Sequence, residues 1–596
     1  PRPAPTRPAR TPRLPRPRRP PRMVRLADPR KRLHASLILV FVVLSLLSGR
    51  LIQLQGLDAS SYAAEARSSR MQVVPVPALR GTILDRNGEP LAQSVEAYDI
   101  VVDQKLIAEE GNVAAYALQL EEALGEPARE IQDKLTGDRR YRVLARKVTP
   151  EAWRAIGELR LTGVYSEPTV ERMYPAGSVA GNIVGFVGAE GTGLAGLELS
   201  RNDHLAGEDG ELAYQVARGG ARIPLTGGSH EKAVPGEGLS LTIDRDLQWH
   251  AEQVLSERVE TAKASGGNAV VIDVETGEIV AMASAPVADP RDPAATSGGG
   301  NPAVEAAYEP GSVLKALSVS AVIEEGMAGP ATIFSVPDNI DRADLTIRDH
   351  YDHAQEDMTL SGIIAKSSNV GTILATERLD PGTFGMYLEA FGLGVKPDLG
   401  LPAETAGQLP GEWTNLDRDF ASFGQGISVN TVQLASVYAT IANGGVRMPP
   451  RLIDGVIDTD GEVQPVAAAE PARVISEETA AAVTTMLEGV MGPDGTGNKV
   501  TVDGFRVAGK TGTAQAIDPS CGCYSGKVDV SFVGFAPADE PKYAVAVTVF
   551  NPTAGRSGGS VAGPVFSSVL GLALAKAGIV PSGTEPPEVA IYAGDL

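Results

Sequence analysis

Cysteine is almost missing from this chain, since Cys521 and Cys523 are the two that occur among 596 residues. Two cysteines exclude a disulfide framework, and with no histidine beside them they provide too few ligands for a metal site. We expect a loop pair that can be oxidised outside the cell. The six histidines add little, because His350 and His353 lie in an Asp-rich stretch typical of a polar loop. The sequence predicts neither a metal nor a cofactor.

Long uncharged runs are also scarce, and the one near the N-terminus covers 35–48, about fourteen residues. It is shorter than the roughly 20 residues that span a bilayer, unless the helix continues past Arg50, whose side chain can reach the interface. A cleaved signal peptide is the alternative, but no small-x-small cleavage site follows closely. We predict an uncleaved transmembrane signal anchor over 33–55.

Negative charge is nearly absent before this run. Residues 1–34 contain twelve Arg or Lys and one acid, Asp28, although the chain carries a net charge of −21. Cytoplasmic flanks of membrane helices are rich in Lys and Arg, so we expect the N-terminus in the cytoplasm and the acidic remainder outside the cell membrane. The Arg/Pro-rich tail, 1–32, is predicted to be disordered. Nucleic-acid binding by this tail is the less favoured interpretation.

The remainder is ordinary in composition and long enough for two to four domains in the whole chain. Short strand and helix patterns with many turns fill 56–235, a region without obvious chemistry whose end is punctuated by Gly and Pro. Strands, then helices, then strands again fill 236–583, which predicts an α+β domain with an antiparallel sheet. A tail over 584–596 follows.

Three short motifs stand in order in the second of these domains. They are Ser312-Val-Leu-Lys315, Ser367-Ser-Asn369 and Lys510-Thr-Gly-Thr513. None is specific alone, because Ser-x-x-Lys recurs at Ser229 and Ser-x-Asn recurs at Ser200 and Ser428. Order, spacing and predicted local structure distinguish the three motifs from these chance matches.

The first motif is typical of a serine nucleophile and its base. Ser312 and Lys315 are three residues apart on a predicted helix, so they share one face. A serine hydroxyl needs a base to take its proton, and a lysine can do so if burial or a second cation lowers its pKa. Lys510 is the candidate second cation. The alternative is a surface lysine and a capping serine.

The second and third motifs complete a site for acyl transfer. Ser367 and Asn369 lie between two short helical runs, so a loop can project them into a cleft, although simple capping of the second helix is the alternative. Lys510 begins a motif on a predicted strand where Gly512 removes a side chain beside the substrate. A phosphate loop is excluded, because the glycine-rich lead and following helix are missing.

The chain resembles the penicillin-binding proteins and serine β-lactamases, which share this set of motifs, and most closely the class B penicillin-binding proteins of the FtsI division type. The resemblance also rests on RGTILDRNG (80–88), RMYPAG (172–177), GLAGLE (193–198), LTIDRDLQ (241–248), YEPGSVLK (308–315), SFGQGISVNTVQLASVYATIANGG (422–445) and AGKTGTAQ (508–515). The long Arg/Pro tail and the Ala-rich composition are similar to actinobacterial members.

The resemblance implies a transpeptidase domain of the penicillin-binding type, preceded by an elongated α+β pedestal resembling a dimerisation domain and one transmembrane helix. It implies that Ser312, Lys315 and Ser367 are catalytic. It further implies that the substrate is bound by Asn369, Lys510, Thr511, Gly512 and Thr513, with the backbone N–H groups of Ser312 and Thr513 as oxyanion hole.

The implied function is cross-linking of peptidoglycan stem peptides in septal cell-wall synthesis, with β-lactams as inhibitors. The implied partners are a polytopic glycosyltransferase of the shape, elongation, division and sporulation class and other membrane proteins of the divisome. Alternatives are an elongation-type transpeptidase, a hydrolase such as a D,D-carboxypeptidase or β-lactamase, and a non-catalytic assembly protein. The Cys-x-Cys loop after the third motif is not a recognised feature of the family.

Overall fold

The computed structural model describes residues 29–58, 60–62, 71–216, 222–223, 230–294, 300–518 and 520–596. Contacts divide the chain into two units. The first comprises Pro1–Val73 and Ala213–Ser229, and the second comprises Val74–Leu212 and His230–Leu596. We describe each unit by itself.

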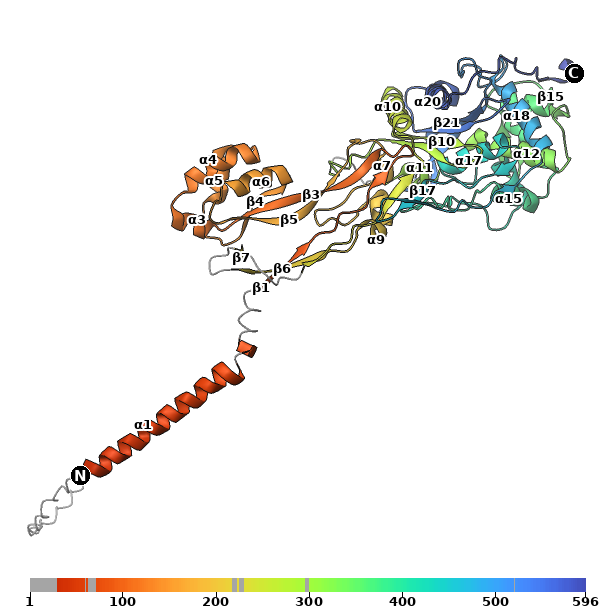
Figure 1. The fold of residues 1–596 in the computed structure, drawn as a ribbon. Coiled ribbons are helices and arrows are strands. Elements are labelled where there is room, and N and C mark those ends of the chain that lie inside the picture. The colour runs from red at the N-terminus through yellow and green to blue at the C-terminus, as the bar shows by residue number, and fades with distance from the viewer. Residues whose placement is uncertain are drawn as a thin grey trace, which may run out of the picture. The chain divides into compact units, whose positions relative to one another are not determined.

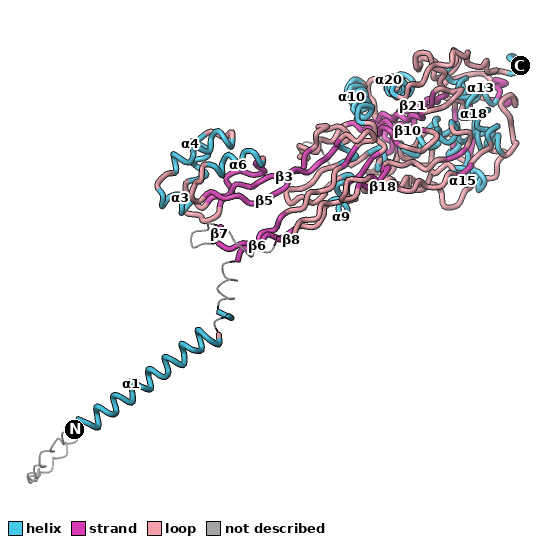
Figure 2. The backbone as a smooth tube through the Cα atoms, in the orientation of Figure 1, coloured by secondary structure: helices cyan, strands magenta, loops and turns pink. Residues whose placement is uncertain are grey.

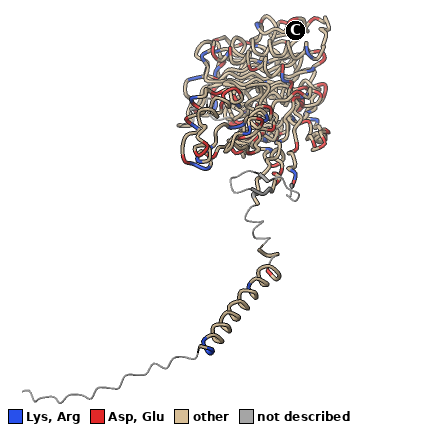
Figure 3. The backbone as a smooth tube through the Cα atoms, turned by 60° about the vertical axis from the view of Figure 1, so that its left-hand side comes forward, with Lys and Arg blue, Asp and Glu red and all other residues tan. Residues whose placement is uncertain are grey.

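The first unit contains the apolar helix α1, Pro29–Ile52, which continues as a π-helical turn, Gln53–Leu57. Together they are 29 residues long and apolar enough to cross a membrane. Figure 3 shows that the basic residues of α1 lie towards its two ends. The helix therefore exceeds the short run seen in the sequence, because it extends through flanking residues on both sides. The sequence of 56–70 is typical of a short helix leading off the membrane, and of this stretch residues 59 and 63–70 lie outside the described residues.

The N-terminal part of the second unit is built on a long antiparallel ladder. Strand β3, Pro90–Val102, pairs over Gln93–Val102 with β5, Val164–Met173, and near its end with β4, Arg142–Val148 (Figures 1 and 2). Four helices, α3 Gln104–Glu110, α4 Val113–Leu124, α5 Ala128–Leu135 and α6 Pro150–Glu158, share a core with this end of the ladder. Strand β2, Ile83–Leu84, forms a hairpin with β3, pairing antiparallel with it across the Asn87-Gly88 turn.

The second unit contains two domains, the first built on this ladder and the second formed by the C-terminal part of the chain. Strand β9, Gly238–Leu241, joins the ladder to the second domain. It pairs parallel with β2 and antiparallel with β17, Ile453–Ile457. Buried ion pairs link three sequence stretches in this N-terminal part of the unit. Glu198, in GLAGLE, accepts hydrogen bonds from Arg80, in RGTILDRNG, and from Arg172, in RMYPAG. The short elements around it are α7 Gly181–Val184, α8 Gly196–Ser200 and α9 Asn202–Leu205.

The second domain is organised on a five-stranded antiparallel sheet of order β11-β10-β22-β21-β20. Its strands are β10 Gly266–Asp273, β11 Ile279–Ala285, β20 Ala508–Asp518, β21 Cys523–Ala536 and β22 Tyr543–Phe550. All residues of β10 are buried, and Ala269 and Val271 enter one core while Val270 and Ile272 enter the other. Because alternate side chains point to opposite faces, both faces of the sheet are covered, and the predicted α+β fold is confirmed.

Helices cover the two faces of this sheet. One face packs on α10, Arg245–Thr261, and α20, Gly563–Lys576, and the other on α17, Thr431–Ala442. A helical group that carries the first two motifs comprises η2 Gly311–Leu314, α12 Lys315–Glu324, α13 Leu360–Lys366, α14 Asn369–Thr376, α15 Pro381–Ala390, α16 Asn415–Ser422 and α18 Glu477–Met491. The Asp244 side chain caps α10 by accepting from the backbone N–H groups of Asp246 and Leu247.

The remaining elements of the two units are short. They are β1 Met71–Val76, β6 Gly210–Val216, β7 Arg222–Ile223, β8 His230–Glu231, α11 Pro302–Glu305, β12 Ile333–Val336, β13 Asn339–Arg342, β14 Leu345–Arg348, β15 Glu356–Thr359, β16 Val446–Arg447, β18 Val463–Pro465, β19 Ala472–Arg473, α19 Gly558–Val561 and η3 Ala593–Asp595.

Candidate active site

Ser312 lies in the first turn of the helical segment that was predicted to carry it. That turn is a 3₁₀ helix, η2, and α12 starts only at Lys315. Gly311 enters it with a φ of +61°, a left-handed conformation that glycine adopts without a Cβ clash. Ser312 is half-buried and lines a cleft of about 490 Å³.

Glycines let this turn approach β20 closely. A Cβ on Gly512 would stand 2.2 Å from Ser531 Oγ and 2.9 Å from a methyl group of Val313, and one on Gly311 would stand 2.9 Å from the Thr513 carbonyl oxygen. The prediction that Gly512 clears space beside the substrate is therefore incomplete. Its first effect is to let the turn that carries the nucleophile pack directly on the strand.

Lys315 is fully buried and held by the second motif. Its Nζ donates to the Ser367 carbonyl oxygen at 2.6 Å, to Asn369 Oδ1 at 2.8 Å and to Ser367 Oγ at 3.5 Å. The Lys315 backbone N–H donates to the Ser312 carbonyl oxygen, but no side-chain hydrogen bond among the described residues joins Ser312 to Lys315. The second motif, and not the nucleophile, thus fixes the side chain of the lysine.

Burial lowers the pKa of Lys315 to about 7, and the charge of Asp349 acts in the opposite direction. Burial also lowers the pKa of Lys510, with a second contribution from the positive charge of Lys315. The low pKa of Lys315 is thus caused by burial, and not, as the sequence suggested, by Lys510 acting as a second cation. Removal from water is the dominant effect on both amines.

The second motif forms the connection between two helices, as predicted. Ser367 ends α13 with a φ of +61°, and Ser368 caps α14 by accepting a 2.8 Å hydrogen bond from the Gly371 backbone N–H. Capping is therefore the task of Ser368. Ser367 is left free to direct its hydroxyl towards the two lysines, and Asn369 lines the cleft.

The third motif lies on β20, one of the two edge strands of the sheet. Lys510 is fully buried, and its Nζ donates to Ser367 Oγ at 2.9 Å and to the Thr511 carbonyl oxygen at 3.1 Å. The hydroxyl of Thr511 donates to Thr496 Oγ1 at 2.8 Å. Thr513 is exposed to the cleft. The structure therefore brings all three motifs to one place.

Several hydroxyl groups line the cleft. The described residues that line it are Gly311, Ser312, His350, Ser367, Asn369, Phe423, Gln425, Thr496, Thr511, Gly512, Thr513, Ala514, Gln515, Val528, Arg556, Ser557 and Gly558. None of these is an aspartate or a glutamate. The described lining of the cleft thus includes the nucleophile, and the hydroxyl of Ser367 that contacts the two buried amines, but no carboxylate that could activate a water molecule.

Several residues of the site were missed in the sequence. Asp349 binds the start of α14, and His350 lines the cleft although its stretch was read only as a polar loop. Burial, with the nearby Lys315 charge, lowers the pKa of His350. Thr496 had no motif to reveal it. The one available signal was the concentration of Asp and His some twenty residues before the second motif.

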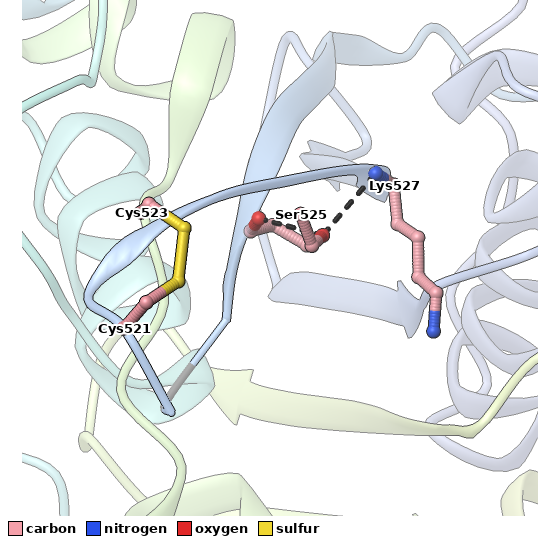
Figure 4. Close-up of a disulfide and its surroundings, with 5 residues drawn as sticks. Cys521, Cys523, Ser525 and Lys527 are labelled. Atoms are coloured by element: carbon pink, nitrogen blue, oxygen red, sulfur yellow. Dashed lines mark hydrogen bonds between the residues drawn. A yellow bond between two sulfur atoms is a disulfide. The ribbon is translucent and has the colours of Figure 1, made fainter.

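The Cys-x-Cys loop forms the end of the β20–β21 hairpin. Cys521 and Cys523 are joined by a disulfide (Figure 4), so the predicted loop pair is oxidised. The next residue, Tyr524, donates its hydroxyl to the carboxylate of Glu309 at 3.2 Å. Glu309 stands three residues before the nucleophile, which places this hairpin beside the entry to the nucleophile turn. Burial raises the pKa of the Glu309 carboxyl.

The chance matches to the motifs have structural roles or lie elsewhere. Asn430, in the match at Ser428, forms a capping box with Gln433 at the start of α17. Ser200 ends α8, in the first domain. Ser229 lies outside the described residues.

Comparison with known proteins extends the likeness beyond the site. A model of the penicillin binding protein transpeptidase domain matches residues 267–571, and one of the penicillin-binding protein dimerisation domain matches residues 75–241. Penicillin-binding protein PbpB of Mycolicibacterium smegmatis is 35% identical, over 93% of this chain and 91% of that protein. Peptidoglycan D,D-transpeptidase FtsI of Escherichia coli K12 is 32% identical, over 91% of each.

Solved structures agree. Penicillin binding protein 3 of Mycobacterium tuberculosis, complexed with aztreonam, is 31% identical with a TM-score of 0.67, covering 87% of this chain and 100% of that one. A peptidoglycan synthetase of Bifidobacterium adolescentis is 32% identical with a TM-score of 0.71, covering 88% and 100%. On these matches, the chain belongs to the class B penicillin-binding proteins of the FtsI and PbpB type.

Proposed function

We propose that this protein is a membrane-anchored peptidoglycan D,D-transpeptidase of septal cell-wall synthesis and a target of β-lactams. The observation that carries the proposal is the meeting of two buried amines, Lys315 and Lys510, on one hydroxyl, Ser367 Oγ, in the cleft that Ser312 lines. Serine acyl transfer needs a base that is neutral near physiological pH. A pKa of about 7 gives Lys315 that property.

The first half-reaction forms an acyl-enzyme. Lys315 takes the proton of Ser312 Oγ, which bonds to the carbonyl carbon between the last two D-alanines of a stem peptide. The backbone N–H groups of Ser312 and Thr513 stabilise the oxyanion. The carbon–nitrogen bond then breaks, and Ser367 passes a proton to the departing D-alanine amine. Lys510 supports this relay, since its hydrogen bond holds the Ser367 hydroxyl.

The substrate is held by the remaining motif residues. Lys510, Thr511 and Thr513 form the site for its terminal carboxylate, where hydroxyl donors and a cation favour an anion. Gly512 keeps the strand close to the nucleophile turn. Asn369 donates to the peptide backbone of the substrate, and its Oδ1 is already engaged by Lys315.

The second half-reaction transfers the acyl group to an amine of a neighbouring strand. That amine attacks the ester carbonyl, the bond to Ser312 Oγ breaks, and the serine regains its proton. A β-lactamase or carboxypeptidase would instead need a group that activates water, typically a carboxylate. No Asp or Glu occurs among the described residues that line the cleft, which favours the transpeptidase.

We divide the chain into a cytoplasmic tail (1–32), a membrane anchor (33–55), a pedestal (56–235), a transpeptidase domain (236–583) and a tail (584–596). The catalytic domain lies outside the cell membrane and the N-terminus inside. The length and apolar character of α1 support the anchor. The charge pattern of its flanks supports this orientation.

The proposed partners are a polytopic glycosyltransferase of the shape, elongation, division and sporulation class and other membrane proteins of the divisome. A cross-linking enzyme needs freshly polymerised glycan as its substrate, so an anchored transpeptidase must work beside a polymerase. The FtsI-type relatives support the divisome as its setting. Depletion of the protein tests this role, since filamentous cells are expected and rounded cells would indicate elongation instead.

A fluorescent penicillin tests the chemistry. The purified protein is expected to be labelled covalently at Ser312, and Ser312→Ala is expected to abolish the label. Ser428→Ala, at a chance match to the second motif, is the matched control and should label normally. Labelling retained in Ser312→Ala would overturn the assignment. Rapid release of hydrolysed penicillin would indicate a β-lactamase.

A further inference from the structure

Among the described residues, Asp349 is the one whose carboxylate accepts hydrogen bonds from the second motif. It follows strand β14, Leu345–Arg348, which forms a hairpin with β13, Asn339–Arg342. Its side chain is 0% exposed. A buried carboxylate is costly unless hydrogen bonds satisfy it, so its surroundings indicate what holds it in place.

Four donors converge on this carboxylate. Oδ1 accepts from the backbone N–H groups of Asn369 and Val370, the latter at 3.0 Å. Oδ2 accepts from Ser368 Oγ at 2.6 Å and from His353 Nε2 at 3.1 Å. Three of the four donors belong to the first residues of α14 and its cap, where backbone N–H groups lack intrahelical partners.

The same hairpin also fixes the side chain of Asn369. Its Nδ2 donates to the Arg348 carbonyl oxygen at 3.0 Å, and its Oδ1 accepts from Lys315 at 2.8 Å. Arg348 and Asp349 therefore hold both the backbone and the amide of the residue that binds Lys315. The hydrogen bonds of Asp349 to Ser368, Asn369 and Val370 join positions 19, 20 and 21 residues apart, so they are tertiary and not a local cap.

We propose that Asp349 is a positioning residue for acyl transfer, which holds the Ser-Ser-Asn motif so that Ser367 and Asn369 keep Lys315 in place. This inference rests on the proposed function. It adds a residue that acts through others and does not touch the substrate.

The charge of Asp349 also acts on the pKa of Lys315, and a residue that only capped a helix would not have this effect. Burial lowers the pKa of Lys315, and the Asp349 charge raises it again. Other charged or titratable groups also face this region. Lys510 shares Ser367 with Lys315, and the pKa of His350 responds to both lysines. His353 binds Asp349 directly, and its hydrogen bonds to Ala354 and Asp349 raise its pKa against the effect of burial.

The test is Asp349→Asn, with the rate of labelling by a fluorescent penicillin measured in the full chain from pH 5.5 to 9. The amide keeps the size of the side chain but removes its charge and part of its accepting capacity. The labelling rate is expected to fall about tenfold, the factor for one lost charge-assisted hydrogen bond. The pH midpoint is expected to fall by about one unit, because Lys315 loses a neighbouring negative charge.

The matched control is Asp380→Asn. Asp380 caps α15 by accepting a 3.2 Å hydrogen bond from the Thr383 backbone N–H, and it is exposed. Its variant removes the charge of a helix cap, whose amide oxygen can still accept the hydrogen bond, and does not affect the second motif, so its labelling rate and pH midpoint should match those of the wild type. Thermal unfolding of all variants separates a loss of stability from a loss of positioning.

Each outcome decides the proposal. A folded Asp349→Asn protein with the wild-type rate and midpoint would overturn it, as would a loss of rate explained by the unfolded fraction alone. Should that variant fail to fold, Ser368→Ala removes one of the four donors, and an unchanged rate in that variant would overturn the proposal instead. Absence of labelling in the wild type would refute the proposed function and not this inference.

Discussion

Lys510 Nζ lies 2.9 Å from Ser367 Oγ, so a residue of the sheet and a residue between two helices share one hydrogen bond. The partners are 143 positions apart in the chain. This bond joins the second and third motifs, while Lys315 joins the first motif to the second. Ser367 is thus the point at which the three motifs meet.

Two substitutions of Ser367 distinguish the contribution of its hydroxyl group from that of its backbone conformation. Both Ser367→Ala and Ser367→Gly are expected to lose most labelling by a fluorescent penicillin, because neither can relay a proton. The glycine variant should be the more stable by roughly 1 kcal/mol, because φ of +61° is strained for alanine. Thermal unfolding compares the two. Equal stability would mean that the left-handed backbone carries no strain here.

The labelling rate should rise with pH through the pKa of Lys315, about 7, and level off above it. The neutral amine is the form that accepts the proton of Ser312. Stopped-flow measurement of penicillin acylation between pH 5.5 and 9 checks this. A rate that falls as pH rises would show that the charged amine is required instead.

Stability should depend on pH for the same reason. Lys315 titrates near pH 7 in the folded protein and near its ordinary value of 10.5 in the unfolded chain. Between these values the unfolded chain binds more protons, so the free energy of unfolding rises with pH, by at most about 1.4 kcal/mol per unit. Lys315→Met should flatten this rise, and Lys396→Met, at an exposed lysine, should not. Denaturant unfolding at several pH values measures both.

Gly512→Ala is expected to displace the nucleophile turn. The added methyl group would meet Ser531 Oγ and Val313, which should cost about 1–3 kcal/mol and most of the labelling. Gly571→Ala is the control, since its nearest neighbour would be Val502 at 3.9 Å. Normal labelling in Gly512→Ala would mean that the strand and the turn can separate without harm.

Tyr524→Phe tests the contact made by the disulfide-closed hairpin. Loss of the hydroxyl removes a donor from the buried Glu309 carboxylate, so labelling is expected to fall about fivefold, as for one ordinary hydrogen bond. Replacing Cys521 and Cys523 together with serine should have a similar effect if the disulfide holds Tyr524 in place. Adding Tyr524→Phe to that double variant should then change little.

The sequence was sufficient to predict the residues whose chemistry is carried by their own side chains. Ser312, Lys315 and Lys510 stood in recognisable motifs, and the helix–loop–helix around Ser367 followed from two short apolar runs. The strands of the sheet were also predictable, because β-branched residues and turn signals mark them.

Asp349 could not be predicted in the same way. Its role depends on a hairpin that returns the chain to α14, and nothing in the local sequence specifies that approach. The burial that lowers the pKa of Lys315 is likewise a property of the assembled core. The tight contact at Gly512 also appears only once Val313 and Ser531 are placed around it.

The position of β20 at the margin of the sheet has a further consequence. An open strand margin can recruit any extended chain, and soluble proteins usually block such margins. Here residues 511–515 border the cleft, and a bulge interrupts the regular pairing of β20 beyond Gln515. Five residues span about 17 Å, enough to dock a short peptide but too little to template a long strand. The margin can therefore stay open for substrate with little risk of self-association.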